Sequence, residues 1–171
     1  MKGLESLQMR SLLVGVTVML TLVCCHHSRH DERSEEQSAK AIGHAECALC
    51  GMVVREQSGP RGQVVHADGE RVFLCSISDL VMYLQMPSTH GSVVQTYVEV
   101  LEVGTSPSGD LKKQWPWVPA PTASFVAGVD RKRVMGEPML AYDDVEAARV
   151  SAEKYHGEVL GWQATFERLA R

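Results

Sequence analysis

Two junctions in the chain constrain its fold most, because in each an apolar strand runs directly into a helix with a capping residue. The first junction is 73–80 and the second is 139–145. After the first, apolar side chains recur at positions 77, 80, 81 and 84, a spacing that places them on one helical face. Each junction has one predicted strand before it and another after it. The sequence therefore predicts two related ββαβ units, about 46–103 and 104–171, in one compact α+β domain.

The elements of these units are predicted from apolar patterns and turn residues. Asp68-Gly69 between two apolar runs is a strong hairpin signal, and the four prolines within 104–121 indicate a long loop. We expect strands at 52–56, 63–67, 71–74, 93–103, 122–128, 139–142 and 158–160. We expect three helices. The first is capped by Ser76 or Ser78, and the second is capped by Asp143 or Asp144 and runs to His156, with Gly157 closing it. The third begins near Trp162.

Residues 1–24 are typical of a bacterial secretory leader. Its basic start is followed by an apolar stretch at 12–23, and twelve helical residues span ~18 Å, too short for a ~30 Å hydrocarbon core. The end of the leader resembles a lipobox, with Leu22 three positions before Cys25 and the small Cys24 directly before it. We predict a lipid on Cys25, with Cys24 as the other candidate. An uncleaved anchor and a soluble secreted protein are the alternatives.

The segment 25–45 is polar, and we expect a disordered tether because it has almost nothing to bury. The folded domain is then expected at 46–171. A formal net charge of −4 argues against nucleic-acid binding, which uses clustered positive charge. The chain has no P-loop, dinucleotide fingerprint or nucleophile elbow, and no paired acid and base. We therefore expect a protein that is not an enzyme.

The chemistry centres on the block from Cys47 to Met52, Cys-Ala-Leu-Cys-Gly-Met, for which three interpretations compete. The CxxC spacing suits a thiol–disulfide couple, but thioredoxin-type sites place it at a helix N-terminus and here a strand is expected to follow. Cys75 and His66 could complete a Cys₃His zinc site, but the chain lacks a second CxxC. The third interpretation is a site for Cu(I).

Cu(I) is a soft ion that prefers thiolate and thioether ligands. Cys50 and Met52 lie two residues apart, so on an extended segment both side chains point to one face. Cys75 ends an apolar strand, and we expect a small buried residue there, with an additional ligand as the alternative if it is exposed near the site. We expect Asp79 to be a helix-capping carboxylate.

This block, the hairpin at Asp68-Gly69, the segment 73–84 and Met135-Gly136 together resemble the NosL family, roughly from Glu46 to Trp162. That family consists of membrane-anchored copper lipoproteins encoded with bacterial nitrous-oxide reductase. The resemblance implies two related ββαβ units and one bound Cu(I). This sequence departs from the family pattern at Cys75, where a thiol is not usual.

The resemblance also implies roles for individual residues. It places Cys50 and Met52 at Cu(I) and makes Met135 a second thioether ligand. Cys47 is then a ligand, a reserve thiolate or a disulfide partner in the resting protein. His66, on the hairpin facing the block, is a further candidate.

The function implied is a Cu(I) metallochaperone in the periplasm, anchored by its lipid to a membrane, which we expect to be the outer membrane. Its expected partner is nitrous-oxide reductase, whose catalytic copper centre it would supply, or the assembly machinery of that enzyme. The alternatives are a thiol–disulfide oxidoreductase using Cys47 and Cys50, and a zinc-stabilised structural lipoprotein.

Overall fold

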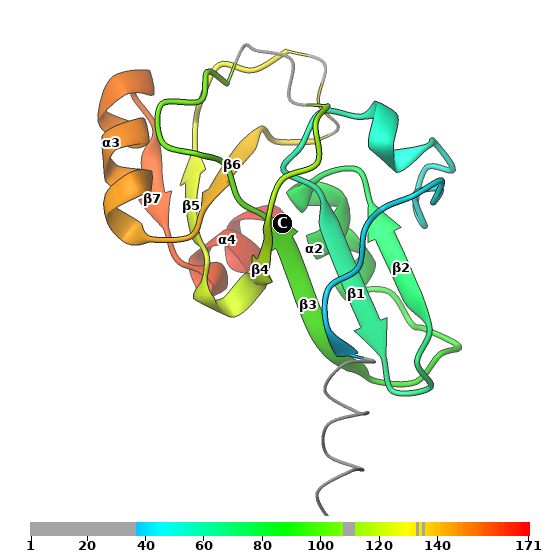
Figure 1. The fold of residues 1–171 in the computed structure, drawn as a ribbon. Coiled ribbons are helices and arrows are strands. Elements are labelled where there is room, and N and C mark those ends of the chain that lie inside the picture. The colour runs from blue at the N-terminus through cyan, green and yellow to red at the C-terminus, as the bar shows by residue number, and fades with distance from the viewer. Residues whose placement is uncertain (1–36, 108–111, 133, 135) are drawn as a thin grey trace, which may run out of the picture. The chain divides into compact units, whose positions relative to one another are not determined.

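The computed structural model describes residues 37–107, 112–132, 134 and 136–171 (Figure 1). The predicted leader, the predicted lipidation site Cys25, most of the predicted tether and Met135 lie outside the described residues. Ala39–Arg171 forms one compact unit. Near its start, the side chain of Ile42 is only 3% exposed and packs within the hydrophobic core.

The first half of the chain forms a four-stranded antiparallel sheet with the order β2-β1-β3-β4. Gly69, with a φ of 89°, makes the predicted turn between the first two strands. Helix α2 begins after Ser76, whose hydroxyl accepts a hydrogen bond from the amide of Asp79 at 3.0 Å. The elements are β1 (Gly62–His66), β2 (Arg71–Leu74), α2 (Ile77–Leu84), β3 (Val93–Glu99) and β4 (Trp117–Pro119).

The second half forms a three-stranded antiparallel sheet with the order β6-β5-β7. Its elements are β5 (Ser124–Ala127), β6 (Met139–Tyr142), α3 (Val145–Tyr155), β7 (Glu158–Leu160) and α4 (Trp162–Leu169). In each half the first strand lies between the second and the third, and a helix connects the second strand to the third (Figure 1). The predicted pair of ββαβ units in an α+β fold is confirmed.

The strand predicted at 52–56 is wrong. The chain makes a single bridge between Glu46 and Val53 and then a 3₁₀ helix, η1 (Val54–Glu56). The amide of Val54 bonds the carbonyl of Ala45 at 3.0 Å, and the amides of Glu56 and Gln57 bond carbonyls three residues back. These backbone groups are therefore satisfied locally and do not extend a sheet.

The strand predicted at 93–103 ends at Glu99, and the loop predicted at 104–121 contains β4 and η2 (Ala120–Thr122). Beyond Glu99 the amide of Val100 bonds the carbonyl of Pro116, and that of Leu101 bonds the carbonyl of Ala141 at 2.8 Å. The hydrogen bond from Leu101 to Ala141 connects the end of the first half to β6, so it joins the two halves.

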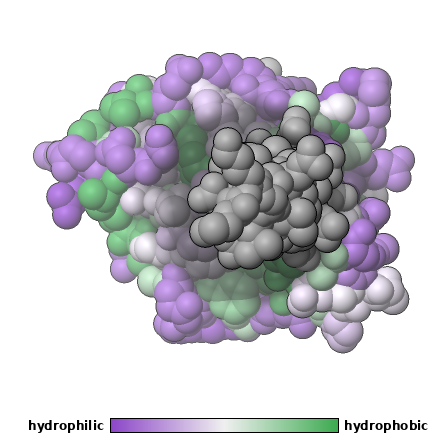
Figure 2. All heavy atoms as spheres, turned by 60° about the horizontal axis from the view of Figure 1, so that its bottom comes forward, coloured by the Kyte–Doolittle hydropathy of each residue, from purple (hydrophilic) through white to green (hydrophobic). Residues whose placement is uncertain are grey.

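The described residues form two hydrophobic core clusters, and the larger one runs through both halves. Leu74 of β2 and Phe125 of β5 are both fully buried members of it. A fully buried ion pair, Arg61 Nε to Glu99 Oε2 at 2.6 Å, lies among the strands of the first sheet. Figure 2 shows a face on which hydrophilic residues predominate and apolar residues lie between them. None of the described helices has the length and apolar character needed to cross a bilayer.

Candidate metal centre

The cysteine block forms a closed turn. The amide of Cys47 bonds the carbonyl of Met52 at 2.8 Å, and the amide of Gly51 bonds the carbonyl of Cys47 at 2.9 Å. Gly51 has a φ of 70°, a left-handed conformation that glycine adopts at little cost. The chain therefore turns between Cys50 and Met52 and is not an extended segment there.

Backbone pairing holds this turn against the end of β2. Cys47 forms a parallel bridge with Phe73, and the amide of Ala48 bonds the carbonyl of Phe73 at 3.1 Å. Cys75 follows Phe73 by two residues, at the point where β2 leads into α2. The pairing therefore brings together cysteines that are 25 or more residues apart in sequence.

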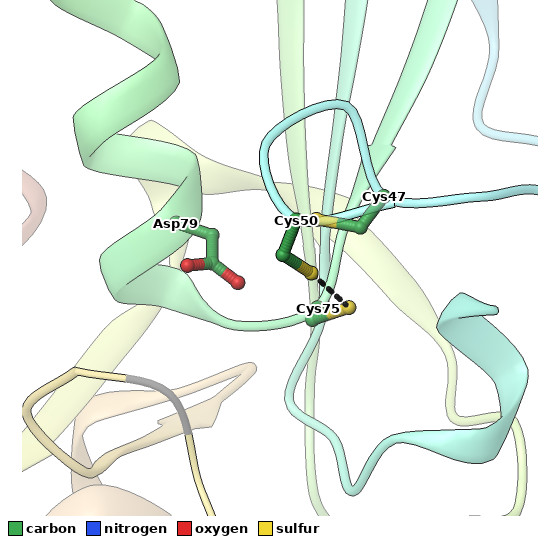
Figure 3. A group of neighbouring side chains, drawn as sticks. All are labelled: Cys47, Cys50, Cys75 and Asp79. Atoms are coloured by element: carbon green, nitrogen blue, oxygen red, sulfur yellow. Dashed lines mark hydrogen bonds between the residues drawn. The ribbon is translucent and has the colours of Figure 1, made fainter. Parts of the chain in front are cut away.

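Three thiols and one carboxylate converge at this point (Figure 3). One ligand atom from each of Cys47, Cys50, Cys75 and Asp79 lies within 4.8 Å of the others. The sulfurs of Cys50 and Cys75 are 3.7 Å apart, and all three cysteines are free thiols. Cys47 and Cys75 are only 3% and 2% exposed, whereas Cys50 is partly exposed. These four residues are called the cysteine cluster below.

The thiols of Cys47 and Cys75 have opposite pKa shifts. A hydrogen bond from the Cys75 thiol is the main reason that the pKa of Cys47 falls to about 4, and the amides of Cys50 and Leu49 lower it further, against the effect of burial. The same hydrogen bond, with burial, raises the pKa of Cys75. The pair therefore holds one proton and one negative charge near neutral pH.

Asp79 belongs to the cluster, and the helix-capping role predicted for its carboxylate is wrong. The cap of α2 is the hydroxyl of Ser76, and the carboxylate of Asp79 instead points toward the cysteines (Figure 3). Its Oδ2 is buried and has no hydrogen-bond partner among the described residues. Burial, followed by the charge on Cys47, raises the pKa of this carboxyl.

Cys75 is buried as expected, but it also belongs to the cluster. The sequence does place a thiol directly before the helix-capping Ser76, which is a position next to a helix N-terminus. The sequence does not show the pairing of Cys47 with Phe73, because that contact forms only in the folded chain.

The other predicted site residues lie in different surroundings. Met52 is partly buried and packs against the core. His66, at the end of β1, is not in the cluster: its Nε2 is 2.9 Å from the hydroxyl of Tyr83, and its Nδ1 is 3.3 Å from the carbonyl of Gly91. Both ring nitrogens therefore already have partners.

The residues that follow Met135 lie close to the start of α2. The hydroxyl of Ser78 donates to the carbonyl of Glu137 at 2.9 Å, and the side chain of Glu137 pairs with Arg168 of α4 at 2.6 Å. A Cβ placed on Gly136 would lie 2.5 Å from the Cβ of Ser78. The second half of the chain thus packs against the helix that carries Asp79.

Fold and cluster together define a class: a small α+β protein with a buried, thiol-rich candidate metal site where a cysteine turn meets a strand-to-helix junction. A family model described as NosL matches residues 39–168. The chain belongs to the NosL family.

Two relatives carry informative names. The copper-binding lipoprotein NosL of Stutzerimonas stutzeri is 26% identical over 157 residues, which cover 92% of this chain and 80% of that protein. The crystal structure of the copper chaperone NosL from Shewanella denitrificans matches with a TM-score of 0.62 and 26% identity, over 74% of this chain and 94% of that one.

Proposed function

We propose that this chain is a Cu(I) metallochaperone and not an enzyme. It binds one Cu(I) at the cysteine cluster and passes the ion to a copper protein. The membership in the NosL family and the names of the two relatives support this proposal.

The convergence of thiol sulfurs at a buried point is the observation that carries the proposal. Cys47 and Cys50 come from the turn, and their ligand atoms lie within 4.8 Å of each other. Thiolates select soft d¹⁰ ions, and the pair of Cys47 and Cys75 already holds one negative charge, with the pKa of Cys47 at about 4. Cys47 can therefore bind a cation near neutral pH without first losing a proton.

The burial of the cluster suits release as well as binding. Cys47 and Cys75 are enclosed, whereas Cys50 is partly exposed. A ligand from an acceptor protein would reach the ion on the Cys50 side and replace one sulfur at a time. Exchange of this kind lets a metal leave a site that holds it tightly against water.

Thioethers complete the proposed ligand set. Met52 ends the turn and is partly buried against the core. Met135 is proposed as a second thioether, because its neighbour Gly136 lies against Ser78 at the start of α2. His66 is left out of the set, because both its ring nitrogens already have partners.

The location and the acceptor form the finer part of the proposal. A lipid on Cys25 would hold the domain in the periplasm on a membrane, which we propose is the outer membrane. The acceptor is nitrous-oxide reductase or its assembly machinery. The lipobox-like end of the leader, and the name of the S. stutzeri lipoprotein, support this part.

Anaerobic titration of Cu(I) into the reduced, purified mature chain tests the proposal. We expect one Cu(I) per chain, bound in competition with a chelator and more weakly in Cys50→Ser and in Met52→Leu. Ser58→Ala, in the turn before β1, is the control and should bind as wild type does. A wild-type chain that ignores Cu(I) would overturn the proposal, and tight Zn(II) binding or a dithiol reductase activity would then identify one of the two alternatives.

A further inference from the structure

We propose that Cys75 is a direct Cu(I) ligand, so that this chain holds its cargo with three thiolates, from Cys47, Cys50 and Cys75. The inference rests on the proposed function and names a ligand that the CxxCGM block does not contain.

The positions of the sulfurs are the first argument. A thiolate lies about 2.3 Å from a bound d¹⁰ ion, as for zinc, so three sulfurs around such an ion lie about 4.0 Å from each other. The sulfurs of Cys50 and Cys75 are 3.7 Å apart, and that of Cys47 is within 4.8 Å of both. A shift of a few tenths of an ångström in each side chain would therefore be enough to close the site.

The rigidity of the two segments is the second argument. The bridge between Cys47 and Phe73 and the hydrogen bond from Ala48 to Phe73 fix the turn to β2. Ser76, directly after Cys75, caps α2 and fixes the backbone on the other side. Both segments are already in place before an ion arrives, so binding requires little rearrangement.

The third argument concerns Asp79, the one member of the cluster that is not a cysteine. Asp79 offers a carboxylate oxygen, which is a hard ligand that suits Zn(II) and does not suit Cu(I). Cu(I) takes thiolate and thioether sulfurs and leaves the oxygen unbound, whereas Zn(II) would take the oxygen as a further ligand. Loss of the Asp79 carboxylate should therefore weaken the binding of Zn(II) and not that of Cu(I).

The test compares Cys75→Ser and Cys75→Ala with wild type in the same anaerobic competition assay. Loss of a group that only supports a ligand weakens metal binding ~10–100-fold, so a direct ligand should cost more than about 100-fold. X-ray absorption at the copper edge should show one sulfur neighbour fewer in both variants. Met82→Leu, which removes an exposed thioether from α2, is the control and should keep wild-type affinity.

Asp79→Asn is measured beside them. A three-thiolate Cu(I) site predicts a change of less than about tenfold in Cu(I) affinity, because the carboxylate is not a ligand. Equal losses in Asp79→Asn and Cys75→Ser would overturn the inference and point to a four-ligand site. Cys75 variants that are folded by circular dichroism and keep wild-type affinity and sulfur number would also overturn it.

The wild-type chain separates this inference from the proposed function. If wild type binds no Cu(I), the chaperone proposal fails, and the ligand proposal fails with it. If wild type binds one Cu(I) and only the Cys50 variant loses it, the chaperone proposal stands and Cys75 is not a ligand. If the Cys75 variants do not fold, X-ray absorption on the copper-loaded wild-type chain still tests the inference, because it counts the sulfur neighbours of the ion.

Discussion

At the scale of single residues, the charge on Cys47 depends on its neighbour. The thiol of Cys75 donates to Cys47 and holds the pKa of Cys47 at about 4, against an ordinary value of 9.0. Cys75→Ala removes this donor, so the pKa of Cys47 should rise toward its ordinary value. The ultraviolet absorbance of thiolate, followed against pH in the reduced metal-free chain, measures the shift.

The same shifts set the pH dependence of stability. The folded pKa of Cys47 lies below its unfolded value, so its contribution is present above pH 9 and is lost as the pH falls toward 4. The folded pKa of Cys75 is raised, so its contribution is present below pH 9 and is lost above it. The difference in unfolding free energy between wild type and Cys75→Ala should therefore peak near pH 9. A difference that does not vary with pH in urea unfolding would contradict the assigned hydrogen bond.

The site could be predicted from the sequence only where its residues are neighbours along the chain. Cys47 and Cys50 are recognisable as a pair because they lie in one short block. Cys75 and Asp79 join them through the pairing of Cys47 with Phe73, a contact between residues 26 apart. Nothing in the local pattern of either segment specifies that contact.

At the scale of the elements, the loop before β6 is a contact between the two halves of the chain. Gly136 has a φ of 70°, and a Cβ there would lie 2.5 Å from the Cβ of Ser78. Gly136→Ala should push this loop away from α2 and destabilise the chain by about 1–3 kcal/mol through overpacking, in addition to the cost of the left-handed backbone. The Cu(I) affinity should fall about tenfold if Met135 is a ligand.

Gly128→Ala is the matched control for this substitution. Gly128 has a φ of 75°, but a Cβ there meets nothing within 4 Å, so the change costs only the backbone strain. Urea unfolding and Cu(I) competition, run on both variants, separate the two effects. If Gly136→Ala is less stable but binds Cu(I) as wild type does, the loop contributes no ligand.

The elements whose bounds were predicted correctly are marked by local sequence patterns. α2 begins at its capping serine, and β6 and β7 have the predicted bounds, because capping residues and short apolar runs mark them. β4 was missed in a proline-rich segment, since it is a strand only through pairing with β3. The end of α3 also differs: His156, with a φ of 57°, takes the left-handed position expected of Gly157.

At the scale of the whole molecule, the repeated order of strands shows how two small sheets make one domain. The two units share a core that contains side chains from both, such as Leu74 of β2 and Phe125 of β5. The backbone bond from Leu101 to Ala141 adds a direct link between the halves. The duplication could be predicted from the sequence because each unit repeats the same local pattern, whereas the contacts between units could not.

Because the halves share this core, Cu(I) bound in the first half should stabilise the whole chain. A ligand at ~100 times its dissociation constant adds about 2.7 kcal/mol to the unfolding free energy. We expect one cooperative transition, shifted upward by several degrees, for a domain of this size. The fluorescence of Trp117 in β4 and of Trp162 in α4 should report the same shift. Cys50→Ser should show a smaller shift at the same Cu(I) concentration. Two separate transitions in the copper-loaded wild type would mean that the halves are stabilised independently.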